Sequence, residues 1–176
     1  MNSLLPPGCI TGIGSLPHAN PVAAVAFVAQ HSSEIPFWPQ LPQRSIDESM
    51  VLEGLEPVWD LLVPQTVGRV ELPAAQMACF AQRLEQATPR LTPYSSAGFF
   101  AFLAACDAGA FATAVALKGH LIGAYTLARS LFVNKRPLTD WPELCAALTD
   151  YLCRLVTWQI EALQRFGKPM LLWIDE

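Results

Sequence analysis

The sequence is short of charged residues. Asp, Glu, Lys and Arg make up 15% of the 176 residues, against about 25% in an average soluble domain. Hydrophobic residues reach 52%, which excludes global disorder, because disordered chains are rich in charge and poor in apolar residues. The 11 basic residues are scattered and the formal net charge is −4, so the chain lacks the basic footprint of a nucleic-acid-binding protein. We expect a fold that buries both faces of its sheet, or that covers apolar surface with a partner.

Signals for secretion or membrane insertion are also missing. The first residues, MNSLLPPGCITG, contain no cationic segment followed by a long apolar run. Residues 97–117 form the most apolar stretch, but Asp107 and two glycines fall within it. This composition fits a short helix followed by a buried strand better than a membrane span. Five cysteines without a signal peptide indicate reduced thiols. We therefore expect a cytoplasmic protein with no membrane partner.

Common cofactor motifs are absent as well. The sequence has neither GxGxxG nor GxxxxGK[ST], so dinucleotide and P-loop sites have no support. The three histidines, His18, His31 and His120, have no cysteine at a metal-binding spacing. The sequence therefore predicts no metal site in this chain.

Short apolar segments alternate with segments of helical periodicity. Four of them predict buried strands, at residues 9–16, 35–38, 112–118 and 169–174. Buried strands that alternate with helices, with polar residues after each strand, are typical of βα units around a parallel sheet. We expect an α/β fold that forms a single domain over residues 1–176.

One segment interrupts this alternation. Residues 58–63 and 67–72 are prone to form strands, and Pro64-Gln65-Thr66 lies between them. They predict an inserted β-hairpin over residues 58–72, with Gly68 as a bulge. The purpose of this insertion does not follow from the sequence.

Four motifs together resemble a known family: TGIGSLPH (11–18), IPFWPQLPQRS (35–45), ALKGHLIGAYT (116–126) and FGKPMLLWIDE (166–176). Their order and spacing are similar to the start of the cobalamin-independent methionine synthase-like proteins, in the wider group that includes uroporphyrinogen decarboxylase. The resemblance implies a TIM barrel. The chain would supply about its first four βα units, as the N-terminal half of a larger barrel. A chain that stops after a buried strand, with no helix to cover it, leads to the same expectation.

The resemblance also implies a chemistry, which is methyl transfer to the thiol of homocysteine in methionine biosynthesis. In the family, zinc lowers the pKa of the thiol and presents it as a nucleophile. The turn Ile13-Gly14-Ser15 resembles the one that binds the amino-acid end of homocysteine, and backbone groups at a glycine suit a carboxylate. Asp175 resembles the acid that holds the ammonium group. Since Asp175 and Glu176 are adjacent on a strand, only one of them can face the substrate.

Three further residues are candidates for substrate binding by their positions. His18 lies in the loop after the first strand, and a helix-capping or exposed role is an equal alternative for it. Arg44 lies after the second strand and could pair with a carboxylate, or could be a solvated surface residue. His120 follows the third strand and would face the barrel mouth, where a structural hydrogen bond is the alternative.

The family's zinc ligands, a His-x-Cys pair with a further acid and cysteine, come from the later half of the barrel, and nothing here matches them. The family implies zinc and a methyl-folate or another methyl donor, while this chain supplies no cofactor ligands. The aromatic residue that methionine synthases place against the folate falls near Ser130. We therefore expect the isolated chain to be inactive, and to pair as a homo-oligomer or with a second chain that completes the barrel.

Two alternatives remain open. The chain could be a non-catalytic half-barrel protein that binds a small ligand or serves assembly. It could also bind a tetrapyrrole, as decarboxylases of the wider group do. The basic residues that a polycarboxylate needs are few here, so the tetrapyrrole ranks last.

Overall fold

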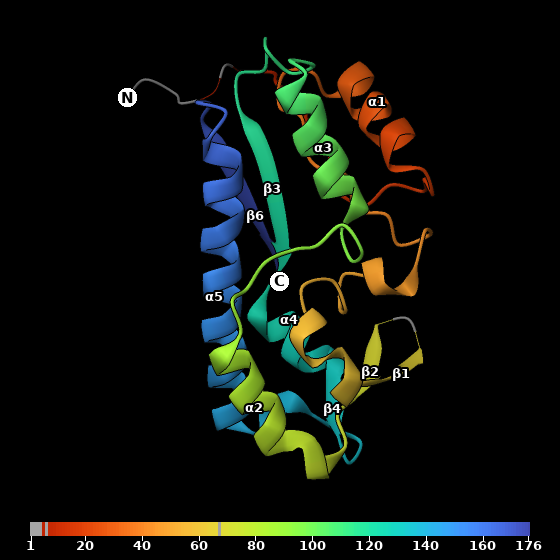
Figure 1. The fold of residues 1–176 in the computed structure, drawn as a ribbon, viewed down its shortest axis with the longest axis vertical. Coiled ribbons are helices and arrows are strands. Elements are labelled where there is room, and N and C mark those ends of the chain that lie inside the picture. The colour runs from red at the N-terminus through yellow and green to blue at the C-terminus, as the bar shows by residue number, and fades with distance from the viewer. Residues whose placement is uncertain (1–4, 6, 67) are drawn as a thin grey trace.

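A computed structural model describes Leu5, residues 7–66 and residues 68–176 (Figure 1). The fold is mixed α/β. The described helices are α1 (Pro21–His31), α2 (Met77–Gln86), α3 (Ala97–Asp107), α4 (Ala124–Ser130) and α5 (Pro142–Gln164). The strands are β1 (Val63–Thr66), β2 (Arg69–Glu71), β3 (Leu117–Ile122), β4 (Leu131–Val133), β5 (Arg136–Pro137) and β6 (Met170–Asp175). Within the described ranges, no helix combines the length and the apolar character that crossing a bilayer requires.

The four motif segments lie in a part of the molecule that is built by parallel strand pairing. β3 and β6 pair in parallel from Leu117↔Met170 to Ile122↔Asp175. Beside β3 lies the extended segment around residues 36–40, since the Lys118 N–H donates to the Pro36 carbonyl at 2.9 Å. Next to it lies the segment around residues 12–16, since the Gln40 N–H donates to the Gly14 carbonyl at 3.1 Å. Four parallel segments thus lie side by side in chain order.

Two of the predicted strands are shorter than expected. Residues 9–16 and 35–38 form only isolated parallel bridges, Ser15↔Gln40 and Phe37↔Lys118. Pro36 and Pro39 flank this pairing, and a proline has no N–H to donate to a ladder. The predicted third strand was displaced, because residues 112–118 were expected and β3 spans Leu117–Ile122.

Helices connect the parallel segments. α1 lies between the first two segments in the chain and packs against α3, whereas α5 packs against both β3 and β6 (Figure 1). Asn20 caps the start of α1, since its Oδ1 accepts hydrogen bonds from the N–H groups of Val22 and Ala23 at 2.9 and 3.1 Å. This is an ordinary N-terminal cap, and it directs the chain away from the first segment immediately after the glycine turn.

The inserted hairpin is present, but the bounds predicted for it, residues 58–72, are wrong. Residues 56–61 form a 3₁₀ helix that buries Val58 and Leu61, and three-residue spacing puts both on one side of such a helix. Residues 64–66 belong to β1 and not to a turn. Gly68, with a φ of +82°, lies between β1 and β2. β2 also pairs in parallel with β4, a strand that the sequence analysis did not identify.

A polar contact in the core joins the second segment to β3. Trp38 is fully buried, and its Nε1–H donates to the Gln159 Oε1 at 3.2 Å. Gln159, on α5, donates from Nε2 to the His120 carbonyl at 3.1 Å. The side chain of Gln159 fits because Gly119 has no Cβ, which would collide with its Oε1. One buried amide therefore links α5, the second segment and the middle of β3.

Candidate functional site

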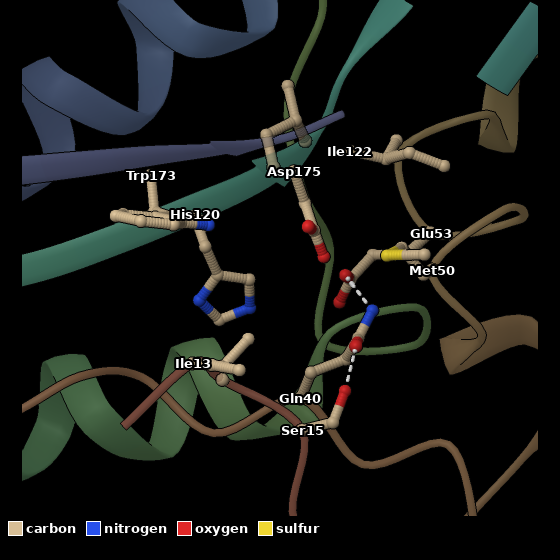
Figure 2. Close-up of a pocket in the computed structure, with 11 residues that line it drawn as sticks. Ile13, Ser15, Gln40, Met50, Glu53, His120, Ile122, Trp173 and Asp175 are labelled. Atoms are coloured by element: carbon tan, nitrogen blue, oxygen red, sulfur yellow. Dashed lines mark hydrogen bonds between the residues drawn. The ribbon is translucent and has the colours of Figure 1, made fainter. Parts of the chain in front are cut away.

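A pocket lies where the parallel segments end, and it encloses a cavity of about 20 Å³ (Figure 2). This is room for one water-sized group. Its lining comes from all four parallel segments and from the turn near Glu53: Ile13, Gly14, Ser15, Gln40, Met50, Glu53, His120, Leu121, Ile122, Trp173 and Asp175. Five of the seven residues that the sequence suggested for substrate binding are in this lining: Ile13, Gly14, Ser15, His120 and Asp175.

The carbonyl groups of the glycine turn are already occupied. The Lys118 Nζ donates to the carbonyl oxygens of Gly12 and Ile13, each at 2.6 Å, and the Gly14 carbonyl accepts from Gln40. The N–H groups of Ile13, Gly14 and Ser15 have no acceptor among the residues that the structure describes. The carbonyl groups of Gly12, Ile13 and Gly14 are therefore engaged within the protein, while the N–H groups of the turn are not. Burial lowers the pKa of Lys118, and the charge of Asp175 partly restores it.

His120 closes the inner side of the pocket. Its ring stacks on Trp38 with centroids 3.8 Å apart. A Cβ on Gly14 would lie 2.6 Å from the His120 Cε1, so only glycine fits at that position. Burial, with a smaller contribution from the Lys118 charge, lowers the pKa of His120 to about 3. The imidazole is therefore neutral at pH 7, and both ring nitrogens lack a hydrogen-bond partner within the described residues.

A chain of hydrogen bonds crosses the pocket wall from Ser15 to Glu53 (Figure 2). The Ser15 hydroxyl donates to the Gln40 Oε1 at 2.6 Å, and the Gln40 Nε2 donates to the Glu53 Oε2 at 2.8 Å. Burial raises the pKa of Glu53 to about 8, against the opposing effects of Ser96 and Gln40. Glu53 thus carries a proton at neutral pH.

The two acids at the end of β6 have separate surroundings. Asp175 lines the pocket. The Glu176 carboxylate accepts hydrogen bonds from the N–H groups of Tyr125 and Thr126 at 3.3 and 3.0 Å, at the start of α4. Gly123 makes room for it, because a Cβ there would collide with the Glu176 carboxylate. Of this pair, Asp175 alone faces the pocket.

Arg44 and His18 lie outside the pocket lining. Arg44 forms an ion pair with the buried Glu48, and its guanidinium partly offsets the effect of burial, which raises the pKa of that carboxyl. The ring of His18 packs 5.4 Å from that of Phe27 on α1. Their roles as substrate-binding residues stay predictions without a geometric connection to this pocket.

The family's zinc does not fit the residues described. Over Leu5, residues 7–66 and residues 68–176, no group of three or more His, Cys, Asp or Glu side chains is placed to hold a metal ion. In the pocket itself, the edge of His120 that carries both nitrogens is covered by Gly14. We therefore derive no step through a metal on this chain.

Sequence reasoning missed three polar residues of the site: Gln40, Glu53 and Lys118. Two of them carried a signal. Glu53 and Lys118 are single charges inside the apolar runs MVLEGL and AVALKGHLI, where burial of a charged group calls for a specific partner. Gln40 belongs to the second segment but lies two residues beyond the strand predicted at 35–38, and no local pattern marks it.

Comparison with known proteins does not add to this geometry. No family model, no curated protein and no solved structure matches the chain.

Proposed function

We propose that this chain binds the amino-acid end of a thiol such as homocysteine, as the N-terminal half of a methionine synthase-like methyltransferase. The observation that carries the proposal is the pairing of donors and an acid in one pocket. Ile13, Gly14 and Ser15, whose N–H groups have no acceptor among the described residues, line the same small cavity as Asp175.

Two sides of the pocket suit the two charged groups of an amino acid. Backbone N–H groups at a glycine turn, where the carbonyl groups of residues 12–14 are already engaged, suit a carboxylate. Lys118 beneath the turn adds a positive charge, since its Nζ contacts the Gly12 and Ile13 carbonyls. Asp175 suits an ammonium group. The side chain of the ligand would then extend outward past Ile13 and Trp173, which are 73% and 55% exposed.

The architecture supports a half barrel. Four parallel segments in chain order, with helices in the connections, are what the first half of a TIM barrel contains. Among the described residues β6 pairs only with β3, and an unpaired strand edge is a template for a further strand. We propose that a second copy or a second chain pairs there and completes the barrel. Zinc and the methyl donor would come from that other half, so this chain alone would not transfer a methyl group.

Isothermal titration calorimetry with L-homocysteine and L-methionine tests the binding proposal. Asp175→Asn should weaken both affinities by tenfold or more, because the ammonium group loses a charged partner. Glu161→Gln, an exposed position on α5, is the matched control and should bind as the unchanged chain does. If the unchanged chain binds neither amino acid, the proposal is wrong.

A second candidate is a non-catalytic protein that binds a small amino acid. The described residues hold no group of three His, Cys, Asp or Glu side chains placed to bind a metal ion, and this candidate requires none. It predicts thermal stabilisation by homocysteine that zinc does not change. Stabilisation of the isolated chain that grows with stoichiometric zinc would contradict both candidates, because both leave zinc binding outside this chain.

A further inference from the structure

Glu53 is a buried carboxyl group in an unusual position. Its side chain is 5% exposed, yet no Lys, Arg or His within the described ranges forms an ion pair with it. The nearby cations are engaged elsewhere, with Arg44 on Glu48 and Lys118 on two backbone carbonyls. Buried carboxyl groups in proteins are paired with a cation or neutralised by a proton, so a cation that enters beside Glu53 would take the place of its proton.

The cavity beside Glu53 has room for a cation. Glu53 and Asp175 line the same cavity from different elements, and Figure 2 shows their carboxyl groups directed into one space. His120, nine-tenths buried with two unpartnered ring nitrogens, lines the cavity beside them. At about 20 Å³ the cavity holds one water-sized group. A primary ammonium group has that size and three N–H donors, whereas a guanidinium group is larger.

We propose that Glu53 makes this pocket selective for a primary ammonium group, with Glu53 and Asp175 accepting its N–H donors from two sides. The bond from Gln40 to the Glu53 Oε2, fixed in turn by Ser15, holds one oxygen in place. The inference deepens the proposed function by naming the residue that recognises the amine, and it rests on that function for the rest of the ligand.

The recognition is coupled to a proton. Glu53 starts as a neutral carboxylic acid, because burial raises its pKa to about 8. When the ammonium enters, the carboxyl ionises, its proton passes to the solvent, and the ammonium keeps all three of its own. The titratable groups that act on Glu53 or share its cavity are Glu48, Asp175 and the neutral His120. Binding should therefore release close to one proton at pH 7 and almost none at pH 9.

Titration calorimetry in phosphate and in imidazole buffer measures this proton, because the two buffers differ in heat of ionisation and neither carries a primary amine. Three probes separate the parts of the ligand: L-homocysteine, 4-mercaptobutanoate, which lacks only the amine, and n-propylamine, which carries only the amine. We compare the unchanged chain with Glu53→Gln and with Glu85→Gln, an exposed position on α2.

We expect homocysteine to release close to one proton at pH 7, and 4-mercaptobutanoate to bind at least tenfold more weakly and release none. Glu53→Gln should abolish the proton release and lower the affinity for homocysteine and n-propylamine at least tenfold. Glu85→Gln should change neither the proton release nor the affinities. Because glutamine is neutral and can keep the bond to Gln40, we expect this variant to fold.

The outcomes distinguish the two proposals. Homocysteine binding that releases no proton, or that Glu53→Gln leaves unchanged, overturns the inference and leaves the proposed function standing. If n-propylamine releases a proton through Glu53 but homocysteine binds no more tightly than n-propylamine, the amine site stands and the proposed function fails. If neither probe binds, both are overturned.

Discussion

β3 and β6 are hydrogen-bonded neighbours in one small sheet, but their surroundings differ. All six residues of β3 are buried, including Lys118 and His120. In β6, Trp173 and Ile174 are 55% and 45% exposed. The reason is pairing, because β3 has the 36–40 segment on one edge and β6 on the other. β6 has only β3 among the described residues.

This difference divides the candidate site into two walls. The wall formed by the glycine turn, Gln40 and His120 is fixed by buried contacts, so its donors are pre-organised for a ligand. The wall formed by β6 carries Asp175 on a strand that is covered on one edge. The geometry of the acid thus depends on what covers the outer edge of β6, whereas the geometry of the turn does not.

The largest expected difference between the two strands concerns their tryptophans. Trp38→Ala, behind β3, should lower the free energy of unfolding by about 3–5 kcal/mol, because it leaves a cavity among fully buried side chains. Trp173→Ala, on β6, should cost less than about 1 kcal/mol, because the indole is largely in solvent. Urea denaturation followed by circular dichroism measures both. Equal losses would contradict the division into a buried and an exposed wall.

The free energy of unfolding should also depend on pH, through Glu53 beside the buried wall. The pKa of Glu53 rises from its ordinary value of 4.5 to about 8 on folding. The unfolded chain therefore ionises first, and stability falls as the pH rises from about 4.5 to 8. Glu53→Gln should remove this fall and stabilise the protein at pH 8.5 by about 2–4 kcal/mol. Chemical denaturation across that window checks it, and parallel profiles for the two proteins would contradict it.

The buried amide behind the site is the next test. Gln159→Leu keeps a similar volume but leaves the Trp38 N–H and the His120 carbonyl without their partner. An unpaired buried group costs about 1–3 kcal/mol, so we expect a loss of roughly 2–3 kcal/mol. Denaturation measures this loss, with Gln164→Leu, exposed at the end of α5, as the control. A loss no larger than in the control would show that the amide does not join the three elements.

The smallest expected effect on stability falls on the exposed wall. The double substitution Trp173→Thr and Ile174→Thr should change the free energy of unfolding of the monomer by less than about 1 kcal/mol. It should nevertheless reduce self-association, because both side chains lie on the strand with the unpaired edge. Size-exclusion chromatography with light scattering measures the mass of both proteins. A stable monomer before substitution would count against pairing at β6.

The elements that local chemistry determines could be predicted from the sequence. α1 has a capping Asn20 followed by a proline, and α5 has apolar residues at helical spacing on its buried face. The parallel α/β character followed from the alternation of these helices with apolar segments. The limits of the hairpin could not be predicted, because Val58 and Leu61 suit a strand by composition and were placed in a 3₁₀ helix by packing.

The displacement of β3 has an electrostatic cause. The sequence analysis ended this strand near Lys118, where polar residues begin. The strand continues through Ile122 because the buried Lys118 ammonium contacts the Gly12 and Ile13 carbonyls and the neutral His120 ring stacks on Trp38. Such contacts come from segments about a hundred residues away, and no local pattern contains them.

Some residues of the candidate site could likewise be predicted from the sequence, and others could not. Motifs identified the turn, His120 and Asp175, since each lies at the end of an apolar segment. Glu53 lies outside the four motif segments and reaches the pocket only through tertiary packing. Arg44 illustrates the reverse, since it lies in a motif but its position beside Glu48 draws it away from the cavity.

At the end of β6, successive side chains point to opposite faces. The number of residues in the strand therefore decides which acid faces the cavity. Asp175 faces the cavity and Glu176 caps α4, and this assignment depends only on the parity of their positions. Deleting one residue between Met170 and Ile174 would bring Glu176 to the cavity position and move Asp175 back to the position of Ile174, so α4 would lose its carboxylate. Substitutions in β6 would change the site gradually, whereas a single-residue deletion would change which acid it holds.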